Sequence, residues 1–338
     1  MENIEVLNLT KEILSIDSPS GYTENVINYL KGEVDKLGYK TEITNKGNLI
    51  VTVSGDSSNT IGVFAHVDTL GLMVRSIKAN GNLAVTTIGG PCLSTLDGEY
   101  CRIITRDKKI YTGTILSNSP SVHVYQDAST LPRDLNNMEI RIDEEVQTKE
   151  DVEKLGIANG DIVAIDTKTT ITTSGFIKSR FLDDKLSVGI LLSILKDLKD
   201  EKLTKSIKFI FTVFEEVGHG ASYIPNDITE ILGVDMGCIG SDLSCTEYDV
   251  SICAKDSSGP YDYNMVSDLV NIAKDNNLSY AIDIYPMYGS DVSAALRGGN
   301  NIKGALIGPG VHASHGMERS HIKAVINTKK IILEYLKK

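Results

Sequence analysis

The chain has 338 residues, of which 41% are hydrophobic, and carries a formal net charge of −11. This composition excludes a fibrous or disordered chain and predicts a globular protein with one large domain or two moderate ones. The acidic balance would repel nucleic acid and anionic membranes, so we expect neither as a partner.

Two further patterns concern the compartment. The N-terminal residues lack the basic start and small-residue cleavage site of a secretion signal, and no run approaches the roughly 18 apolar residues of a membrane span. We therefore expect a cytoplasmic protein. The five cysteines form no CxxC pair, and their odd number predicts free thiols rather than a disulfide framework or a zinc-thiolate site.

The first 69 residues contain helices and strands. Residues 8–17 and 24–38 have apolar side chains at helical spacing, and Gly38 stands where a helix C-cap is expected. Residues 40–55 are typical of two strands joined by a turn. The apolar run that follows, in residues 60–69, ends in polar side chains.

The predicted secondary structure then changes twice along the chain. Residues 70–165 consist of short β-type runs separated by turn residues, which predicts a small all-β insert. From residue 166 onward strands again alternate with helices. The pattern predicts an α/β domain formed by residues 1–69 and 166–338 and interrupted by the insert.

Polar side chains recur where apolar runs end. "TVFEEVG" places Glu215 and Glu216 side by side, although successive strand side chains face opposite ways. Other apolar runs end in His66, Asp242 and His315. In open α/β sheets the carboxyl ends of strands border the ligand crevice, so these residues are expected to converge.

This set of residue types favours a metal site. Imidazole and carboxylate ligands suit zinc, cobalt and manganese, and a carboxylate is able to bridge two metal ions about 3.5 to 4 Å apart. Carboxylates gathered without cations would repel one another, and bound metal ions would remove that cost.

The chain resembles the M42 family of metallo-aminopeptidases, which includes glutamyl aminopeptidases and tetrahedral aminopeptidases. The resemblance extends over nearly the whole chain and rests on the order of several motifs, which are "AHVDTLGLMV", "EEVQTKEDVEKLGIANGDIV", "FLDDKLSVGILL", "FTVFEEVG", "GSDLS" and "HASHGMER". It implies a mixed-sheet α/β zinc-peptidase domain with an inserted PDZ-like or barrel domain used for dimerisation.

The resemblance also implies a ligand set for two divalent metal ions, with zinc as the default and cobalt or manganese as alternatives. One ion would take His66, Asp183 and Asp242, and the other would take Glu216, His315 and the same Asp183 as a bridge.

The catalytic roles follow from the same resemblance. Glu215 would be the general base for a water that bridges the metals, and Asp68 would accept a hydrogen bond from the far nitrogen of His66. The family pattern further implies a cis peptide bond between Asp183 and Asp184.

Some positions depart from the family pattern or leave a choice open. Thr69 stands where relatives usually have a glutamate, and its effect on activity is open. His315 is preferred as the last ligand because it precedes the Gly-Met-Glu of "HGMER". His312 is the runner-up, and His321 is expected on a helix surface.

Simple structural roles are expected for several other residues. His123 and His219 are expected to be non-ligands, and Ser290 or Asp291 is an ordinary helix N-cap candidate. Asp143 and its two glutamate neighbours are expected to form a solvated cluster.

The predicted activity is removal of N-terminal residues from peptides that have a free N-terminus. The alternative is a metal-dependent deacylase or another amidohydrolase using the same site, and a non-catalytic scaffold is disfavoured because Glu215 and all five proposed ligands are present. Family resemblance implies a homo-oligomer in which dimers build towards a tetrahedral dodecamer. The preferred first residue is left open.

Overall fold

The computed structural model describes residues 2–56 and 59–338. They form two compact units, one of Met1–Thr69 with Lys168–Lys338 and the other of Leu70–Thr167. The first boundary lies where the sequence pattern places it, and the second is displaced by two residues, since the pattern ends the insert at residue 165.

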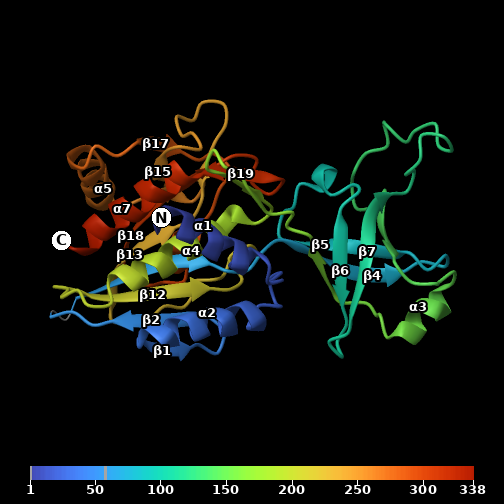
Figure 1. Cartoon of the computed structure of the whole chain (residues 1–338), viewed down its shortest axis with the longest axis horizontal. Coiled ribbons are helices and arrows are strands. Elements are labelled where there is room, and N and C mark those ends of the chain that lie inside the picture. The colour runs from blue at the N-terminus through green and yellow to red at the C-terminus, as the bar shows by residue number, and fades with distance from the viewer. Residues whose placement is uncertain (1, 57–58) are drawn as a thin grey trace. The chain divides into compact units, whose positions relative to one another are not determined.

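The first unit contains six helices among its described residues (Figure 1). They are α1 (Glu2–Leu14), α2 (Glu24–Leu37), α4 (Leu182–Asp197), α5 (Tyr263–Asp275), α6 (Asp291–Arg297) and α7 (Ile322–Leu336). Gly38 ends α2 in the left-handed conformation, with φ of 84°, as the sequence predicts. None of the helices in the described part of the chain is both long and apolar enough to cross a bilayer.

A ten-stranded mixed sheet forms the centre of this unit. Its strands are β1 (Lys40–Ile43), β2 (Leu49–Val53), β3 (Thr60–His66), β12 (Ser206–Thr212), β13 (Ile228–Val234), β14 (Gly237–Cys238), β15 (Val250–Asp256), β16 (Gly259–Pro260), β17 (Tyr280–Ile284) and β18 (Lys303–Val311). The main order is β1-β2-β12-β3-β13-β18-β15-β16, and β12, β3, β13 and β18 run parallel. A separate three-stranded sheet contains β10 (Thr170–Ile171), β11 (Phe176–Ser179) and β19 (Glu318–His321).

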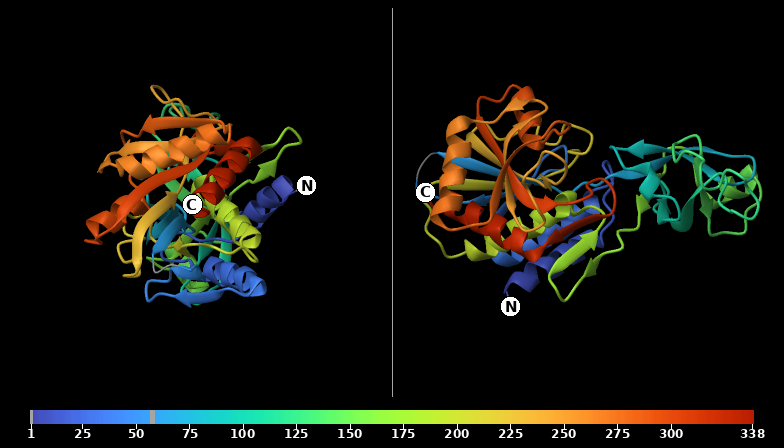
Figure 2. Two further views of the ribbon diagram at one scale, coloured as in Figure 1. Left: turned by 90° about the vertical axis from the view of Figure 1, so that its left-hand side faces the viewer. Right: turned by 90° about the horizontal axis from the view of Figure 1, so that it is seen from above.

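Both faces of the central strands are covered. Every residue of β3 is buried, which explains its continuous apolar run. The blue, yellow-green and red helices α1, α4 and α7 pack together, with α4 on β3 and α7 on β18 (Figure 2). Helix α6 packs on β13 and β18 through Val292, within a core that includes Phe64 and Leu306.

The second unit contains a closed antiparallel barrel. Its strands follow the order β4-β5-β8-β7-β6-β9 and are β4 (Gly71–Ile77), β5 (Leu83–Ile88), β6 (Tyr100–Ile104), β7 (Ile110–Ser117), β8 (Met138–Ile142) and β9 (Ile162–Ile165). Closure leaves no free sheet edge, which suits a small β domain. The predicted α/β architecture with a β-barrel insert is confirmed.

The insert is not entirely β, however. A short 3₁₀ turn (Leu93–Thr95) and helix α3 (Lys149–Leu155) lie in its loops. Thr148 and Asp151 form a reciprocal capping box at the start of α3, and Gly156 ends it with φ of 90°. These local caps explain a helix that the surrounding β pattern obscures.

Candidate metal centre

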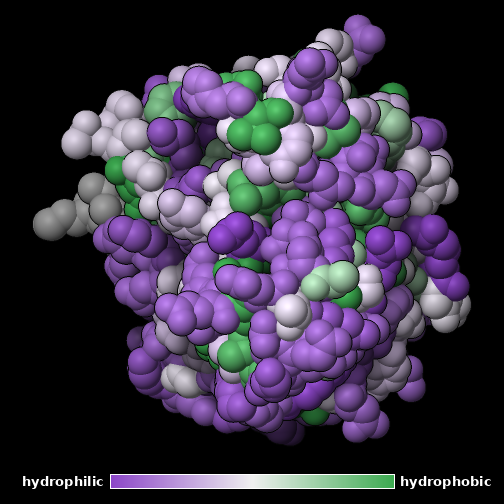
Figure 3. All heavy atoms as spheres, turned by 90° about the vertical axis from the view of Figure 1, so that its right-hand side faces the viewer, coloured by the Kyte–Doolittle hydropathy of each residue, from purple (hydrophilic) through white to green (hydrophobic). Residues whose placement is uncertain are grey.

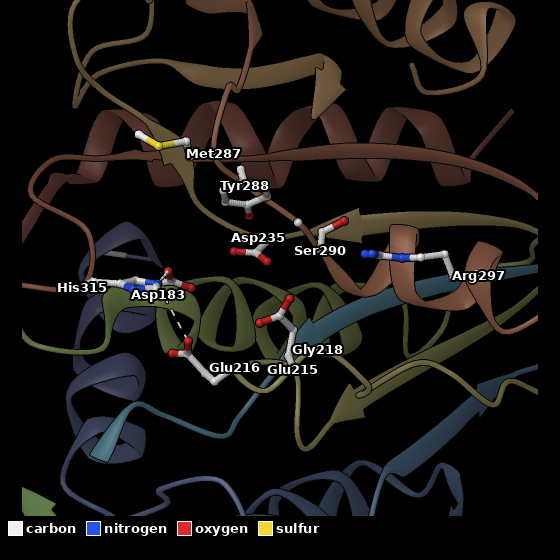
Figure 4. A pocket seen from close by; sticks show the side chains of 11 residues that line it. Asp183, Glu215, Glu216, Gly218, Asp235, Met287, Tyr288, Ser290, Arg297 and His315 are labelled. Atoms are coloured by element: carbon white, nitrogen blue, oxygen red, sulfur yellow. Dashed lines mark ion pairs between the residues drawn. The ribbon is translucent and has the colours of Figure 1, made fainter. Parts of the chain in front are cut away.

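The candidate site lies at the edge of the sheet where parallel strands end. His66 is the last residue of β3, Asp235 directly follows β13, and Glu215 and Glu216 lie shortly after β12. Because β3 pairs in parallel with β12 and β13, these ends meet. A cleft of about 250 Å³ opens here (Figure 4), and it is lined by Asp183, Glu215, Glu216, Gly218, Asp235, Met287, Tyr288, Gly289, Ser290, Arg297 and His315.

Asp183 lies between two histidines. Its Oδ1 is 3.1 Å from Nε2 of His66, and its Oδ2 is 3.7 Å from Nε2 of His315. Each oxygen of one carboxylate therefore faces a different imidazole. This is the arrangement expected of a carboxylate that bridges two cations.

The adjacent glutamates extend to different parts of the cleft. Glu216 Oε2 lies 3.8 Å from Nε2 of His315, whereas Glu215 Oε2 lies 3.8 Å from Nε2 of His66. Oε1 of Glu216 is buried and has no hydrogen-bond partner among the described residues. Figure 4 shows Glu216 directed towards Asp183 and Glu215 directed towards Asp235. The two neighbours are thus placed for different tasks.

The structure does not bring Asp242 to this cluster. Asp242 is exposed, follows the short strand β14 with φ of 63°, and is not among the residues that line the cleft. Asp235 is 6% exposed, and its carboxylate shares a potential metal-binding group with His66 and Asp184. The structure thus places Asp235, which directly follows the parallel strand β13, at this cluster, and Asp242 lies outside it.

Asp68 contacts His66 through its backbone carbonyl and not through the predicted carboxylate. His66 Nδ1 donates to the backbone carbonyl of Asp68 at 2.9 Å, while the Asp68 carboxylate lies 3.7 Å from that nitrogen. The bond orients the ring so that Nε2, the nitrogen that would bind a cation, faces Asp183. The carboxylate instead accepts the backbone N–H groups of Glu215 and Glu216, at 3.1 and 3.3 Å.

Glu318 has the corresponding role on the other side of the site and was not predicted as a site residue. It is 2% exposed, and its two oxygens accept the backbone N–H groups of Asp183 at 3.1 Å and His315 at 3.0 Å. One buried carboxylate thus fixes the backbone of two candidate ligands. In the sequence, the position of Glu318 three residues after His315 is the only feature that indicates this role.

Two buried side chains hold the ends of the segment that carries Glu215 and Glu216. Asn48 accepts from the Val213 N–H at 3.0 Å and donates to the Gly220 carbonyl at 3.1 Å. Asp291 accepts from the Thr212 hydroxyl and from the Ala221 N–H. Ser290 is the N-cap of α6, and Asp291 instead uses its carboxylate to hold this segment.

The electrostatics of the protein chain alone are unfavourable for so many carboxylates. Burial, together with neighbouring acids, raises the pKa values of Glu215 and Glu216 well above the usual range and raises the pKa of Asp235 to about 7. Burial would raise the pKa of Asp183 too, but its bond to His66 and the His315 charge hold that pKa low.

The histidine facing these acids responds in the opposite direction. Burial lowers the pKa of His66, but its bond to Asp183 and the nearby carboxylate charges outweigh this effect and raise the pKa well above its usual value. The donor set fits divalent cations, since the cleft presents four carboxylates and only one arginine. The unpartnered Oε1 of Glu216 supports the same fit.

The remaining predictions have mixed outcomes. The Asp183–Asp184 peptide bond is cis, as the resemblance implies. His312, His123 and His219 are exposed and do not line the cleft, and His219 stacks on Phe214.

The prediction that His321 lies on a helix surface is wrong. This residue is 6% exposed, and it caps α7 by accepting from the Lys323 N–H. Its ring also packs edge-on against Phe176 and Tyr248, which explains its burial.

Comparison with known proteins agrees with this geometry. A family model described as M42 glutamyl aminopeptidase matches residues 47–331, and the chain belongs to this family of metal-dependent aminopeptidases. It is thus a hydrolase. The putative aminopeptidase YhfE of Bacillus subtilis (strain 168) is 46% identical over 336 residues, which span 98% of this chain and 97% of that protein.

Solved structures share the fold over the same extent. Aminopeptidase APDkam598 from the archaeon Desulfurococcus kamchatkensis superposes with a TM-score of 0.89 at 25% identity, covering 99% of this chain and 95% of its own. A structure described as PhTET1-12s, a dodecamer in the asymmetric unit, gives a TM-score of 0.85 at 25% identity and 98% coverage of both chains.

Proposed function

We propose that the protein is a dinuclear metal-dependent aminopeptidase. The observation that carries this proposal is the position of Asp183 between His66 and His315, with one oxygen facing each ring. His66, Asp183 and Asp235 would hold one divalent cation, and Asp183, Glu216 and His315 the other. Zinc is the default for this donor set, with cobalt or manganese as alternatives. When bound, the cations supply Lewis acidity and lower the pKa of water in the cleft.

Glu215 is the proposed general base. It lines the cleft, its side chain is 14% exposed, and no lysine or arginine forms an ion pair with it among the described residues. A carboxylate in this position accepts a proton from water as the water oxygen bonds to the first peptide carbonyl carbon. The C–N bond then breaks, its electron pair stays on nitrogen, and Glu215 returns the proton to that nitrogen.

The acidic surroundings favour a free N-terminus. Four carboxylates line the cleft, and a free substrate amine would find hydrogen-bond acceptors there that an acylated nitrogen would use poorly. This contrast separates the aminopeptidase from the deacylase or amidohydrolase alternative. Peptides with a free N-terminus are therefore the proposed substrates.

The position of Arg297 indicates a preference for substrates whose N-terminal residue is acidic. Its guanidinium extends from α6 towards the cleft (Figure 4), and Nε is fixed by donating to the Ser293 carbonyl at 3.2 Å. None of the ion pairs among the described residues involves Arg297. A guanidinium in a binding cleft matches a carboxylate side chain, so glutamate or aspartate would be preferred over neutral residues of the same size.

The testing experiment compares aminoacyl-p-nitroanilides with their N-acetylated counterparts. The zinc-loaded wild type is expected to hydrolyse only the free amines, and Glu215→Gln is expected to lose activity by about 10²- to 10⁴-fold while its metal content is unchanged. Preference for the acetylated compounds would instead favour the amidohydrolase. Glutamyl and glutaminyl substrates in the same panel test the acidic preference, because they differ chiefly in charge.

Homo-oligomerisation through the insert is also proposed. The fold match to a dodecamer supports it, and exposed apolar side chains occur on the insert at Tyr100, Ile110, Val122 and Val124. On the face drawn in Figure 3 apolar groups are scattered among polar ones, and they form no single large apolar patch there. Light scattering would distinguish a dimer from a twelve-subunit assembly.

A further inference from the structure

The hydroxyl of Tyr288 is a buried polar group without a partner. Its oxygen has no hydrogen bond to any described residue. By contrast, Tyr261 donates to Asp256 at 2.8 Å, and the hydroxyl of Tyr285 is bonded to that of Ser251. Leaving a buried hydroxyl unsatisfied opposes folding. Among the described residues, the buried side-chain atoms without a partner that belong to the lining of the cleft are those of Glu216 and Tyr288.

The same hydroxyl faces the metal centre. Tyr288 lines the cleft, and its phenol group points towards Asp235 in Figure 4. The ring is held by an edge contact with Tyr285, at a centroid distance of 5.1 Å and an interplanar angle of 64°. The hydroxyl is therefore presented to the cleft by a ring that is itself packed in place.

Few other donors compete for this position. The Ser290 hydroxyl is already bonded to that of Tyr261 at 3.0 Å, and Arg297 enters from the end of α6. The carboxylates of the cleft are acceptors when ionised. The acids therefore give no hydrogen bond to a carbonyl oxygen that gains negative charge in this cleft, and a hydroxyl donor there would add to the Lewis acidity that bound cations would supply.

We propose that the Tyr288 hydroxyl is a catalytic hydrogen-bond donor to the carbonyl oxygen of the bond being cleaved. This inference rests on the proposed aminopeptidase function. As the water oxygen bonds to the carbonyl carbon, the C=O π electrons move to the carbonyl oxygen, which accepts the Tyr288 hydrogen bond. The electrons return when the C–N bond breaks, and Tyr288 keeps its proton throughout.

The experiment compares zinc-loaded wild type, Tyr288→Phe and the control Tyr285→Phe. Tyr288→Phe is expected to lower kcat by about 10- to 1,000-fold at unchanged KM, to keep its zinc in a chelator competition, and to keep its melting temperature. It should also bind an α-aminoboronic acid, whose tetrahedral form resembles the attacked carbonyl, at least about 10-fold more weakly, while binding the free amino acid normally. Tyr285→Phe removes a bonded hydroxyl and should lower the melting temperature without this selective loss.

Two results would overturn the proposal. One is a Tyr288→Phe variant with wild-type kcat and wild-type boronic acid affinity. The other is a loss of zinc that matches the loss of activity and is reversed by excess zinc, because Tyr288 would then only orient Asp235. Wild-type activity in the same assay distinguishes failure of this proposal from failure of the proposed function. An inactive wild type that also fails to bind the boronic acid would reject both the aminopeptidase function and the role of Tyr288.

Discussion

The Asp68 carboxylate accepts the backbone N–H of Glu215 at 3.1 Å, while the backbone carbonyl of Asp68 accepts from the His66 ring at 2.9 Å. Asp68 is fully buried, and its carboxylate receives a further hydrogen bond from the Ser20 hydroxyl at 2.5 Å. One residue thus connects a candidate metal ligand with the proposed base. It uses its backbone for the ligand and its side chain for the base.

This division of roles predicts the effect of Asp68→Asn. An asparagine retains the carbonyl that fixes His66, but its side chain has one oxygen to accept two N–H groups and a hydroxyl. We therefore expect kcat to fall by about 10- to 100-fold while zinc content stays near the wild-type level. Steady-state kinetics and metal analysis of the same preparation measure both quantities.

Ser20→Ala is the matched control for this prediction. It removes one bond to the Asp68 carboxylate and leaves both N–H contacts, so its kcat should change less than that of Asp68→Asn. Zinc loss in Asp68→Asn as severe as in His66→Ala would contradict the argument, because it would mean that the side chain controls His66.

A second prediction separates two aspartates that lie close in sequence. Asp235→Asn should reduce zinc retention by about 10- to 1,000-fold, because a neutral amide is a poor substitute for a carboxylate ligand. Asp242→Asn should bind zinc and cleave substrate like the wild type, because Asp242 is exposed and outside the cleft. Equal loss in both variants, or loss in Asp242→Asn alone, would restore the ligand first expected from the sequence.

The pattern in the sequence predicts some of this site and misses other parts for identifiable reasons. His66, Glu215 and Glu216 come after apolar runs that stop, and the parallel strands bring them together as expected. Asp235 is harder to find because the apolar run "ILGVDMGCIG" continues past it, so the end of β13 is not marked. The later "GSD" motif therefore favoured Asp242, which does not line the cleft.

Residues that act through tertiary contacts leave still less signal. Asn48 lies in a predicted hairpin, and its bonds reach residues 213 and 220, far along the chain. Nothing local to Asn48 indicates those partners. Helix α3 is different, since its capping box and terminal glycine are readable in "TKEDVEKLG", but the surrounding strands favoured a β interpretation.

A third prediction concerns the segment that Asn48 holds. Asn48→Ala leaves the Val213 N–H and the Gly220 carbonyl without this partner, so the free energy of unfolding should fall by about 2 to 4 kcal/mol. Because Glu215 and Glu216 lie between those two residues, kcat should fall as well, by about 10-fold or more. Chemical denaturation and kinetics would measure the two effects, and exposed Asn45→Ala in the same turn is the control. A destabilised variant with normal kcat would show that the segment does not need this support.

Removal of the metal ions should make stability depend on pH. In the metal-free protein burial, followed by the charge of Asp183, raises the pKa of Asp235 from 3.8 to about 7. The folded protein then binds more protons than the unfolded chain between about pH 4 and 7, so stability is lost as the pH rises through this window. The slope approaches about 1.4 kcal/mol per pH unit for one proton. We expect the melting temperature of chelated protein to fall between pH 5 and 7.5.

Two comparisons test this account of the metal-free protein. Adding zinc should raise the melting temperature more at pH 7.5 than at pH 5, because cations replace the missing protons. Metal-free Asp235→Asn should show a smaller fall with pH than metal-free wild type. An unchanged fall in that variant would assign the effect to other buried acids, such as Glu215 or Glu216, whose pKa values are also raised.

The last prediction reverses the charge that Arg297 brings to the cleft. In Arg297→Glu a substrate carboxylate would meet a carboxylate in place of a guanidinium, so the ratio of kcat/KM for glutamyl over glutaminyl p-nitroanilide should fall by about 10-fold or more, and lysyl substrate should gain. Exposed Lys303→Glu changes the net charge equally outside the cleft and should leave the ratio unchanged. Equal changes in both variants would indicate a long-range effect of net charge. An unchanged ratio in Arg297→Glu would mean that the first side chain lies elsewhere, since p-nitroanilides carry no other carboxylate for Arg297 to bind.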